Sequence, residues 1–169
     1  HADIFKPNLH EAKDALNLLS VEVTEDSLSG IHALLHEKLE HRVSFITLSE
    51  KGVFYQDGTS KALIPTHIRS IADVSGAGDT VIAVASVVFA VTGNVHLMAD
   101  VANIAGGLVC EEVGTVAINK SRLLQECNSI HYDFIRAIDR ARKTNEPDER
   151  AERLETAFAE CENAIRLLQ

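Results

Sequence analysis

The stretch DVSGAGDTVIAVASVVFA, residues 73–90, decides which fold the sequence predicts. A Gly-Ala-Gly turn at residues 76–78 is followed at once by Asp79, and a nearly unbroken apolar run then extends to Val91. That run is longer than a typical buried strand, and Gly93 stands behind it, where helices often end in glycine. We therefore expect a helix that is buried on nearly all sides and is entered through a glycine loop.

A glycine loop that leads directly into a helix is suited to bind anions, phosphate above all. It presents unpaired backbone N–H groups on one concave surface, and the helix dipole adds positive potential there. Asp79 would repel a phosphate unless its charge had a chemical use, and a base beside a phosphoryl group can take the proton from an attacking hydroxyl. The stretch therefore indicates a phosphotransfer site. The simpler alternative is that Asp79 only caps the helix and the glycines only turn the chain.

The composition excludes several classes of protein. With 169 residues, 46% of them hydrophobic, the chain is long enough for one globular domain with its own core. A net charge of −9 without any Lys/Arg run argues against a nucleic-acid partner, and no apolar stretch reaches the roughly 20 residues of a membrane span. Cys110, Cys127 and Cys161 form no CxxC pair, so we expect a reducing, cytoplasmic setting.

Apolar periodicity predicts alternating strands and helices along the first part of the chain. Helices are expected over residues 9–19, 28–39, 81–91, 97–112 and 120–127. Strands are expected to end at residue 5 and to span residues 43–48, 53–55, 61–64, 68–74 and 116–118. Asp57-Gly58 signals a hairpin turn. This alternation implies an α/β fold with a central, mostly parallel sheet.

The C-terminal part of the chain has a different composition. Residues 130–169 contain no glycine and only one proline, Pro147, and their apolar residues recur at helical spacing. Two amphipathic helices joined near Pro147 fit this pattern. We therefore divide the chain into a domain of residues 1–129 and a helical extension of residues 130–169, which would pack on the domain or bind a partner. A homodimer is one arrangement that the sequence leaves open.

Several motifs together resemble one enzyme family. DVSGAGDT closely resembles the D-x-T-G-A-G-D signature of the ribokinase-like (PfkB-type) carbohydrate kinases. KPNLHE resembles the P-N-x-x-E element of that family, TLSEKG its T-x-G-x-x-G element, and ANIAGGLVCEEVGT its adenine-side helix and the loop after it. The motifs occur in the family's order, and the match covers residues 3 to about 127. The resemblance implies the C-terminal half of a three-layer, ribokinase-like α/β fold.

The resemblance also implies a role for individual residues. It implies a catalytic set, made of the base and the backbone amides of an anion hole: Asp79, Gly76, Ala77 and Gly78. It implies a pair that arranges Mg²⁺ and its waters around the phosphates of ATP: Asn8 and Glu11. It implies residues near the nucleotide: Thr47, Ser49, Gly52, Asn103 and Gly107. For Asn8 and Glu11, helix capping and first-turn charge form the simpler alternative.

Two positions depart from the family pattern. Ser75 stands where threonine is usual and keeps the hydroxyl, whereas Ser49 stands where glycine is usual and restricts the backbone. The pattern T-x-S-E-x-G is nevertheless what we expect of one branch, the D-glycero-D-manno-heptose 7-phosphate kinases of lipopolysaccharide precursor synthesis. The resemblance thus implies ATP- and Mg²⁺-dependent phosphorylation of a sugar or sugar phosphate.

Other interpretations remain open. The chain begins without methionine, and in the resembled family the acceptor sugar is held mainly by an N-terminal half, so we expect a truncated chain. A catalytically incomplete nucleotide-binding fragment or an interaction module is therefore the main alternative. A Rossmann-like dinucleotide protein is a weaker one, because the third glycine of that fingerprint is missing. His32, His36 and His41 are expected on a solvated helix face.

Overall fold

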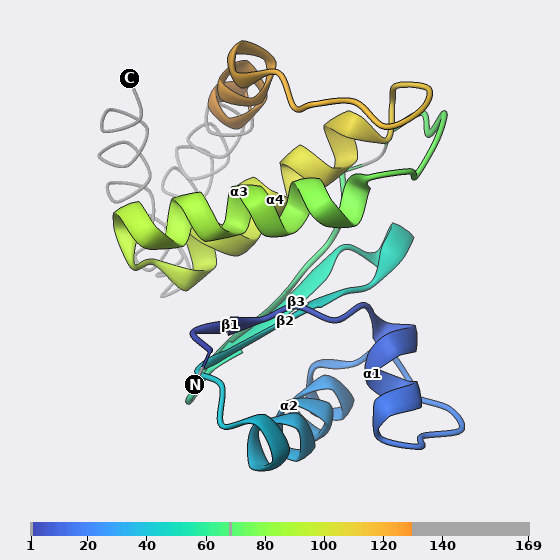
Figure 1. The fold of residues 1–169 in the computed structure, drawn as a ribbon, viewed down its shortest axis with the longest axis vertical. Helices are drawn as coiled ribbons and strands as arrows, with labels where there is room; N and C mark the ends of the chain where they lie inside the picture. The colour runs from blue at the N-terminus through green and yellow to red at the C-terminus, as the bar shows by residue number, and fades with distance from the viewer. Residues whose placement is uncertain (1, 68, 130–169) are drawn as a thin grey trace, which may run out of the picture. The chain divides into compact units, whose positions relative to one another are not determined.

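The computed structural model describes residues 2–67 and 69–129. The chain divides into two compact units, His1–Ala117 and Ile118–Gln169. The first unit has three layers: a sheet, with α1 (Leu9–Ala15) and α2 (Glu25–Leu39) on one face and α3 (Ala77–Thr92) and α4 (Val95–Val109) on the other (Figure 1). This confirms the predicted α/β, three-layer architecture. The helical extension expected at residues 130–169 lies outside the described residues.

The sheet is mixed, which corrects the expectation of a mostly parallel one. Its strands follow one another in the order β1 (Ile4–Phe5), β2 (Val43–Thr47), β3 (Val53–Asp57) and β4 (Ser60–Ile64). Among these described strands, β1 pairs with β2 in parallel, whereas β2–β3 and β3–β4 pair antiparallel. The reason is the length of the connections, since parallel neighbours need a crossover of a dozen or more residues. Only short turns join β2 to β3 and β3 to β4.

The helices on the first face begin and end at local signals. Thr24 caps α2, because its side chain accepts a hydrogen bond from the Ser27 backbone N–H. α1 ends at Ala15, earlier than expected, because Asn17 takes a left-handed conformation with φ 54°. The core between these helices and the sheet is formed by buried apolar side chains: Ala12, Leu28, Ile31, Leu35, Ile46, Leu48 and Phe54.

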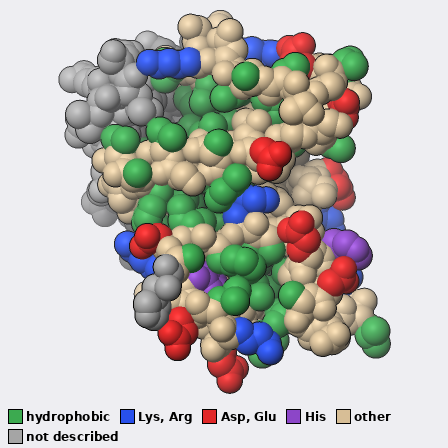
Figure 2. Space-filling view, in the orientation of Figure 1, with side chains coloured by type: hydrophobic (Ala, Val, Ile, Leu, Met, Phe, Trp, Pro, Cys, Tyr) green, Lys and Arg blue, Asp and Glu red, His purple; other side chains and the backbone are tan. Residues whose placement is uncertain are grey.

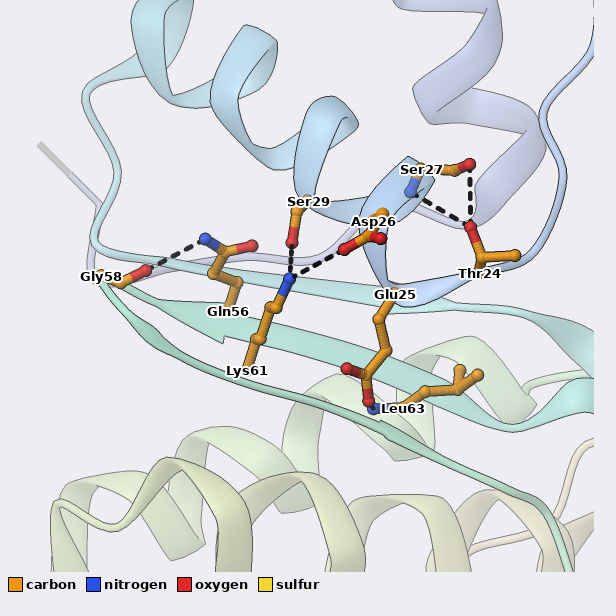
Figure 3. Close-up of polar contacts among 9 residues, drawn as sticks. All are labelled: Thr24, Glu25, Asp26, Ser27, Ser29, Gln56, Gly58, Lys61 and Leu63. Carbon is orange, nitrogen blue, oxygen red and sulfur yellow. Dashed lines mark hydrogen bonds and ion pairs between the residues drawn. The ribbon is translucent and has the colours of Figure 1, made fainter.

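Polar contacts tie the start of α2 to the β3–β4 hairpin (Figure 3). Lys61 Nζ on β4 lies 3.0 Å from Ser29 Oγ and 3.4 Å from Asp26 Oδ1, both on α2. The backbone N–H of Leu63 donates to Glu25 Oε1 at 3.4 Å. These contacts fix the hairpin that the sequence predicts, whose two strands are joined by a tight turn at Gly58, where φ is 57°.

The helices on the second face pack closely against each other. A Cβ added to Gly106 on α4 would lie 2.6 Å from Val81 Cγ2 on α3, so the helices can approach this closely because residue 106 is glycine. α3 ends at Gly93, where φ is 66°, as the sequence predicts.

The expectation that α3 is buried on nearly all sides is wrong for the structure described. α3 buries only one stripe of side chains at helical spacing: Val81, Ala85 and Val88. Val87 and Val91 on its opposite side are 55% and 47% exposed. Figure 2 shows hydrophobic side chains along the outer side of this helical layer.

Two expected strands are absent from the described residues. Residues 69–74 form no strand, because the backbone N–H groups of Ala72 and Asp73 donate to the Cys110 carbonyl at the end of α4, at 2.8 and 3.2 Å. Residues 116–118 form none either, and take part in none of the described strand pairings. Residues 120–129 of the second unit are helical and begin after Asn119, whose side chain accepts from the Arg122 N–H. None of the described helices is long and apolar enough to cross a membrane.

Candidate active site

The glycine loop at the start of α3 leaves backbone donors without acceptors among residues 2–67 and 69–129. Gly76 is the N-cap residue, with φ 78°, and it has no side chain to cap the helix. The Ala77 N–H donates weakly to the Val74 carbonyl at 3.3 Å, whereas those of Gly78 and Asp79 have no acceptor within the described chain. The first turn of α3 therefore presents at least two amide donors to a ligand.

The Asp79 side chain does not cap α3. It lies in the first turn after the N-cap, is exposed, and accepts no hydrogen bond from the described residues. The simpler interpretation of Asp79 as a capping residue therefore does not hold. Its carboxylate stands beside the amide donors and is accessible to a ligand bound there.

Lys6 is the main residue that the sequence interpretation missed. Its Nζ lies 3.7 Å from the position that a Cβ on Gly78 would occupy. Lys6 directly follows β1, so the end of this strand brings a cation to the glycine loop. Because lysine carries three rotatable donors on a compact positive charge, it adds to the attraction of the loop for an anion.

Asn8 and Glu11 form a capping box at the start of α1. The Glu11 N–H donates to Asn8 Oδ1 at 2.8 Å, and the Asn8 N–H donates to Glu11 Oε2 at 2.7 Å. The simpler interpretation, that the pair caps helix α1, is therefore confirmed. Glu11 Oε1 accepts no hydrogen bond from the described residues, so one carboxylate oxygen is still available for metal-bound water.

The fit of this pair to Mg²⁺ follows from its donor types. No group of three or more His, Cys, Asp or Glu side chains in the described ranges could hold a metal ion without other ligands. Mg²⁺ keeps several waters and is usually bound by one or two carboxylates together with substrate phosphates. One amide and one carboxylate, Asn8 and Glu11, are therefore compatible with Mg²⁺ delivered together with a nucleotide.

Thr47 brings the nucleotide side of the predicted site next to the metal side. Thr47 and Asn8 form an isolated parallel bridge at the ends of β2 and β1, and the Thr47 N–H donates to the Pro7 carbonyl at 3.1 Å. The carboxyl ends of neighbouring parallel strands are where α/β folds bind ligands. These two predicted residues are thus side by side.

Ser49 and Gly52 shape the tight connection after β2. Ser49 has φ 56°, a conformation that glycine adopts without strain, so the departure from the family pattern keeps the backbone shape at a cost in strain. Gly52 has φ 95°, and a Cβ there would meet the Ile64 carbonyl oxygen and come within 2.7 Å of Thr66 N. Close packing against the end of β4 therefore already requires glycine at position 52.

The predicted nucleotide residues on α4 contact the connection that follows β4. Asn103 is buried and its Nδ2 donates to the Pro65 carbonyl at 3.0 Å. A Cβ on Gly107 would lie 2.8 Å from Arg69 Nε, and Arg69 pairs with Glu111 at 2.9 Å. No described hydrogen bond or ion pair joins these residues to Asp79 or to the Asn8–Glu11 pair.

Two of the three histidines, His32 and His41, are in the core rather than on a solvated face, which corrects the expectation for them, whereas His36 is exposed as expected. His32 and His41 are buried, and His32 Nδ1 and His41 Nε2 lie 2.8 and 2.6 Å from the same atom, Ser44 Oγ. His36 Nδ1 donates to the His41 carbonyl. Burial, the largest effect, lowers the pKa of both His32 and His41.

Comparison with known proteins gives this arrangement a family. The sequence profile of the pfkB family carbohydrate kinases matches residues 1–122. The chain is 37% identical to the bifunctional protein HldE of Geotalea uraniireducens, over 78% of this chain and 27% of the relative. It is 40% identical to the protein of the same name from Methylobacillus flagellatus, over 73% of this chain and 25% of the relative. The chain thus spans about a quarter of the length of these relatives.

Solved structures support the same fold. Phosphofructokinase-2 from Escherichia coli in complex with potassium superposes with a TM-score of 0.66 at 15% identity, over 73% of this chain and 39% of that one. Ribokinase from Thermotoga maritima gives 0.58 at 18% identity, over 73% of this chain and 42% of that one. At these identities the likeness establishes a ribokinase-like fold and nothing finer.

Proposed function

The chain belongs to the pfkB family of carbohydrate kinases, and from that membership we propose that it serves the transfer of the γ-phosphate of ATP to a hydroxyl of a sugar or sugar phosphate. The observation that carries the proposal is the start of α3. There, the amides of Gly78 and Asp79 have no acceptor among the described residues, and an exposed carboxylate adjoins them.

The proposed chemistry assigns separate tasks to the glycine loop and to Asp79. The acceptor hydroxyl oxygen forms a bond to the γ-phosphorus, the bond from that phosphorus to the bridging oxygen of ADP breaks, and the hydroxyl proton goes to the Asp79 carboxylate. The amides of Gly76 and Gly78 and the Lys6 ammonium stabilise the negative charge on the transferred group, and the Ala77 amide joins them once it leaves its weak, 3.3 Å bond to the Val74 carbonyl. Donors that are fixed before the reaction need no reorganisation when that charge develops.

The proposed cofactors are ATP and Mg²⁺. Asn8 and Glu11 would hold Mg²⁺ through its waters, and the ion would neutralise charge on the phosphates of ATP. The proposed nucleotide-binding residues lie at the end of β2, on the connection after it and on α4: Thr47, Ser49, Gly52, Asn103 and Gly107.

We propose D-glycero-D-manno-heptose 7-phosphate as the acceptor, with the 1,7-bisphosphate as product, in lipopolysaccharide precursor synthesis. The support is the resemblance of TLSEKG and GGLVCEEVGT to the heptose kinase branch and the 31–40% identity to proteins named HldE. Because the chain matches about a quarter of those proteins, substrate and activity are proposals for this chain.

The test is an acceptor-dependent ADP release assay on the full product of the gene. ATP and Mg²⁺ are supplied with heptose 7-phosphate, with fructose 6-phosphate or with no acceptor, and the product is identified by mass spectrometry. We expect release that depends on an acceptor and is fastest with the heptose. Equal release with fructose 6-phosphate would overturn the choice of sugar only. ATP binding without any acceptor-dependent release would overturn the transfer reaction and favour a nucleotide-binding module.

A further inference from the structure

Two segments far apart in the sequence are paired along the edge of the candidate site. One is the glycine loop, residues 73–78, with the connection that precedes it, and the other is the turn after α4, residues 110–115. The N–H groups of Ala72 and Asp73 donate to the Cys110 carbonyl, and a Cβ on Gly76 would lie 2.7 Å from Thr115 Cγ2. The glycine loop is therefore positioned by the turn after α4.

Asp73 connects the side of the glycine loop to that turn through its carboxylate. Its Oδ1 accepts from the Ser75 N–H at 3.0 Å and from the Ser75 hydroxyl at 2.8 Å. Its Oδ2 accepts from the Gly114 N–H at 3.0 Å. Asp73 thus uses both oxygens for three donors, one of which lies in the other segment.

The two aspartates of the opening stretch therefore have different environments. The pKa of the Asp73 carboxyl lies below its ordinary value, because the ionised form accepts the backbone N–H of Ser75, then the Ser75 hydroxyl, then the backbone N–H of Gly114. A carboxylate held in this way is a poor proton acceptor and a good structural anchor. Asp79, by contrast, accepts no hydrogen bond from the described residues.

We propose that Asp73 is a positioning residue for the anion hole, which acts by fixing the glycine loop against the turn after α4. This inference rests on the proposed function. The loop needs such an anchor because Gly76 and Gly114 both have positive φ, 78° and 79°, and glycine has wide backbone freedom. An anion hole works only when its donors are already aimed at the developing charge. Loss of the anchor would leave the chemistry of Asp79 intact and misplace the amides beside it.

Asp73→Asn is the decisive variant. Asparagine keeps the shape of the side chain but turns one oxygen into a donor, which must face either Ser75 or Gly114, where a donor already points. Ser75→Ala removes only the hydroxyl link, and Ser75→Thr keeps it. Asp26→Asn is the matched control, because it removes a fully exposed carboxylate whose only ion pair among the described residues is with Lys61, at 3.4 Å.

The first measurement is amide hydrogen exchange on the full gene product without nucleotide. We expect Asp73→Asn to speed exchange of the Ser75 and Gly114 amides, which donate to the Asp73 carboxylate, by about tenfold or more, the effect of losing a hydrogen bond to a charged group. Ser75→Ala should give a smaller effect, and Ser75→Thr and Asp26→Asn none. Unchanged exchange in Asp73→Asn overturns the proposal. Exchange within α2 reports whether a variant is folded, and Ser75→Ala provides the test if Asp73→Asn is not.

The second measurement is turnover, which separates this proposal from the proposed function. We expect Asp73→Asn to lower kcat by about 10²-fold, a loss similar to that of one anion-hole donor, with a smaller change in KM for ATP. Faster exchange with unchanged kcat would overturn the role of Asp73 in catalysis. A parent protein without acceptor-dependent turnover would overturn the proposed function instead, and the exchange result would still decide whether Asp73 holds the loop.

Discussion

Lys6 and Gly78 meet at the start of α3, with Lys6 Nζ 3.7 Å from the place where a Cβ on Gly78 would be. The contact joins the end of β1 to the first turn of α3, which lies far from β1 in the sequence. It brings one positive charge to amide donors that have no acceptor in the part of the chain that the structure describes. The candidate anion site therefore combines backbone dipoles with a full charge, and each can be removed separately.

Lys6→Met should weaken anion binding and slow transfer. The substitution keeps the length and apolar stem of the side chain and removes the ammonium, so we expect kcat to fall by about 10- to 100-fold if the charge acts on the transferred group. Lys6→Arg, which keeps the charge, should lose less. Lys13→Met, on α1, is the matched control for the loss of a lysine. Equal kinetics for Lys6→Met and the control would show that Lys6 has no part in the reaction.

Asp79→Asn should abolish most turnover and leave ATP affinity largely intact. Removal of a general base typically costs about 10²–10⁴-fold in rate. Asparagine is neutral, so the substitution removes a negative charge beside the phosphates of ATP. ATP affinity should therefore not fall. Single-turnover kinetics and ATP titration measure the two effects separately. Near-normal turnover in the variant would remove Asp79 from the mechanism.

The helices and the hairpin could be predicted because their signals are local. Asp57-Gly58 and Gly93 each determine a turn or a helix end within a few residues, and both predictions are confirmed. The strand expected at residues 68–74 fails over its described part, residues 69–74, because Ala72 and Asp73 find their backbone acceptor at Cys110, which no local pattern announces. The strand propensity of this segment is a local property, whereas its structure depends on hydrogen bonds to Cys110, a residue far away in the sequence.

The candidate site could be predicted only in part for the same reason. The order of short motifs indicated the glycine loop, the P-N-x-x-E element and the connection after β2. The approach of Lys6 to Gly78 and the link from Asp73 to Gly114 are contacts between distant segments. A useful signal was available for Lys6, because it directly follows a strand whose carboxyl end borders the site.

Glu11→Gln should shift the Mg²⁺ dependence of the rate to higher concentrations. Glutamine can replace glutamate in the capping box with Asn8, so helix α1 should keep its stability while the carboxylate charge is lost. Glu11→Ala should lose both the charge and the cap, and so provides the contrast. The rate is measured over a Mg²⁺ titration, and unfolding by urea is followed in parallel. An unchanged Mg²⁺ curve for Glu11→Gln would leave Glu11 with a capping role only.

Ser49→Gly should make the protein more stable. Ser49 has φ 56°, and a left-handed conformation costs a residue with a side chain roughly 1–2 kcal/mol. Glycine removes that strain but gains freedom in the unfolded chain, so the net increase in the free energy of unfolding should be at most about 1 kcal/mol. Ala90→Gly, at an exposed position within α3, should lower stability by about 1 kcal/mol. A loss of stability in Ser49→Gly would mean that its side chain makes a contact worth more than the strain.

The buried histidines should make the fold sensitive to mild acid. Burial lowers the pKa of His32 and His41 below the value of 6.5 that they have when unfolded, so the unfolded chain binds protons first as the pH falls. The free energy of unfolding should therefore be constant above about pH 7 and decrease as the pH falls from about 6.5 toward the lowered pKa values. Asp57, which attracts a proton on His32, opposes this effect and is itself held by Arg42 at 2.8 Å.

His41→Phe is the variant that tests this acid sensitivity. His41 Nδ1 is a buried polar atom without a hydrogen-bond partner among the described residues, and the His41 ring already packs against Phe5 with a centroid distance of 5.5 Å. Phenylalanine should therefore be tolerated at neutral pH and should reduce the loss of stability between about pH 7 and pH 5. His10→Gln is the matched control, because the His10 side chain is 82% exposed. Urea midpoints across this range measure the effect, and a His41→Phe curve parallel to that of the parent would show that His41 does not cause the acid sensitivity.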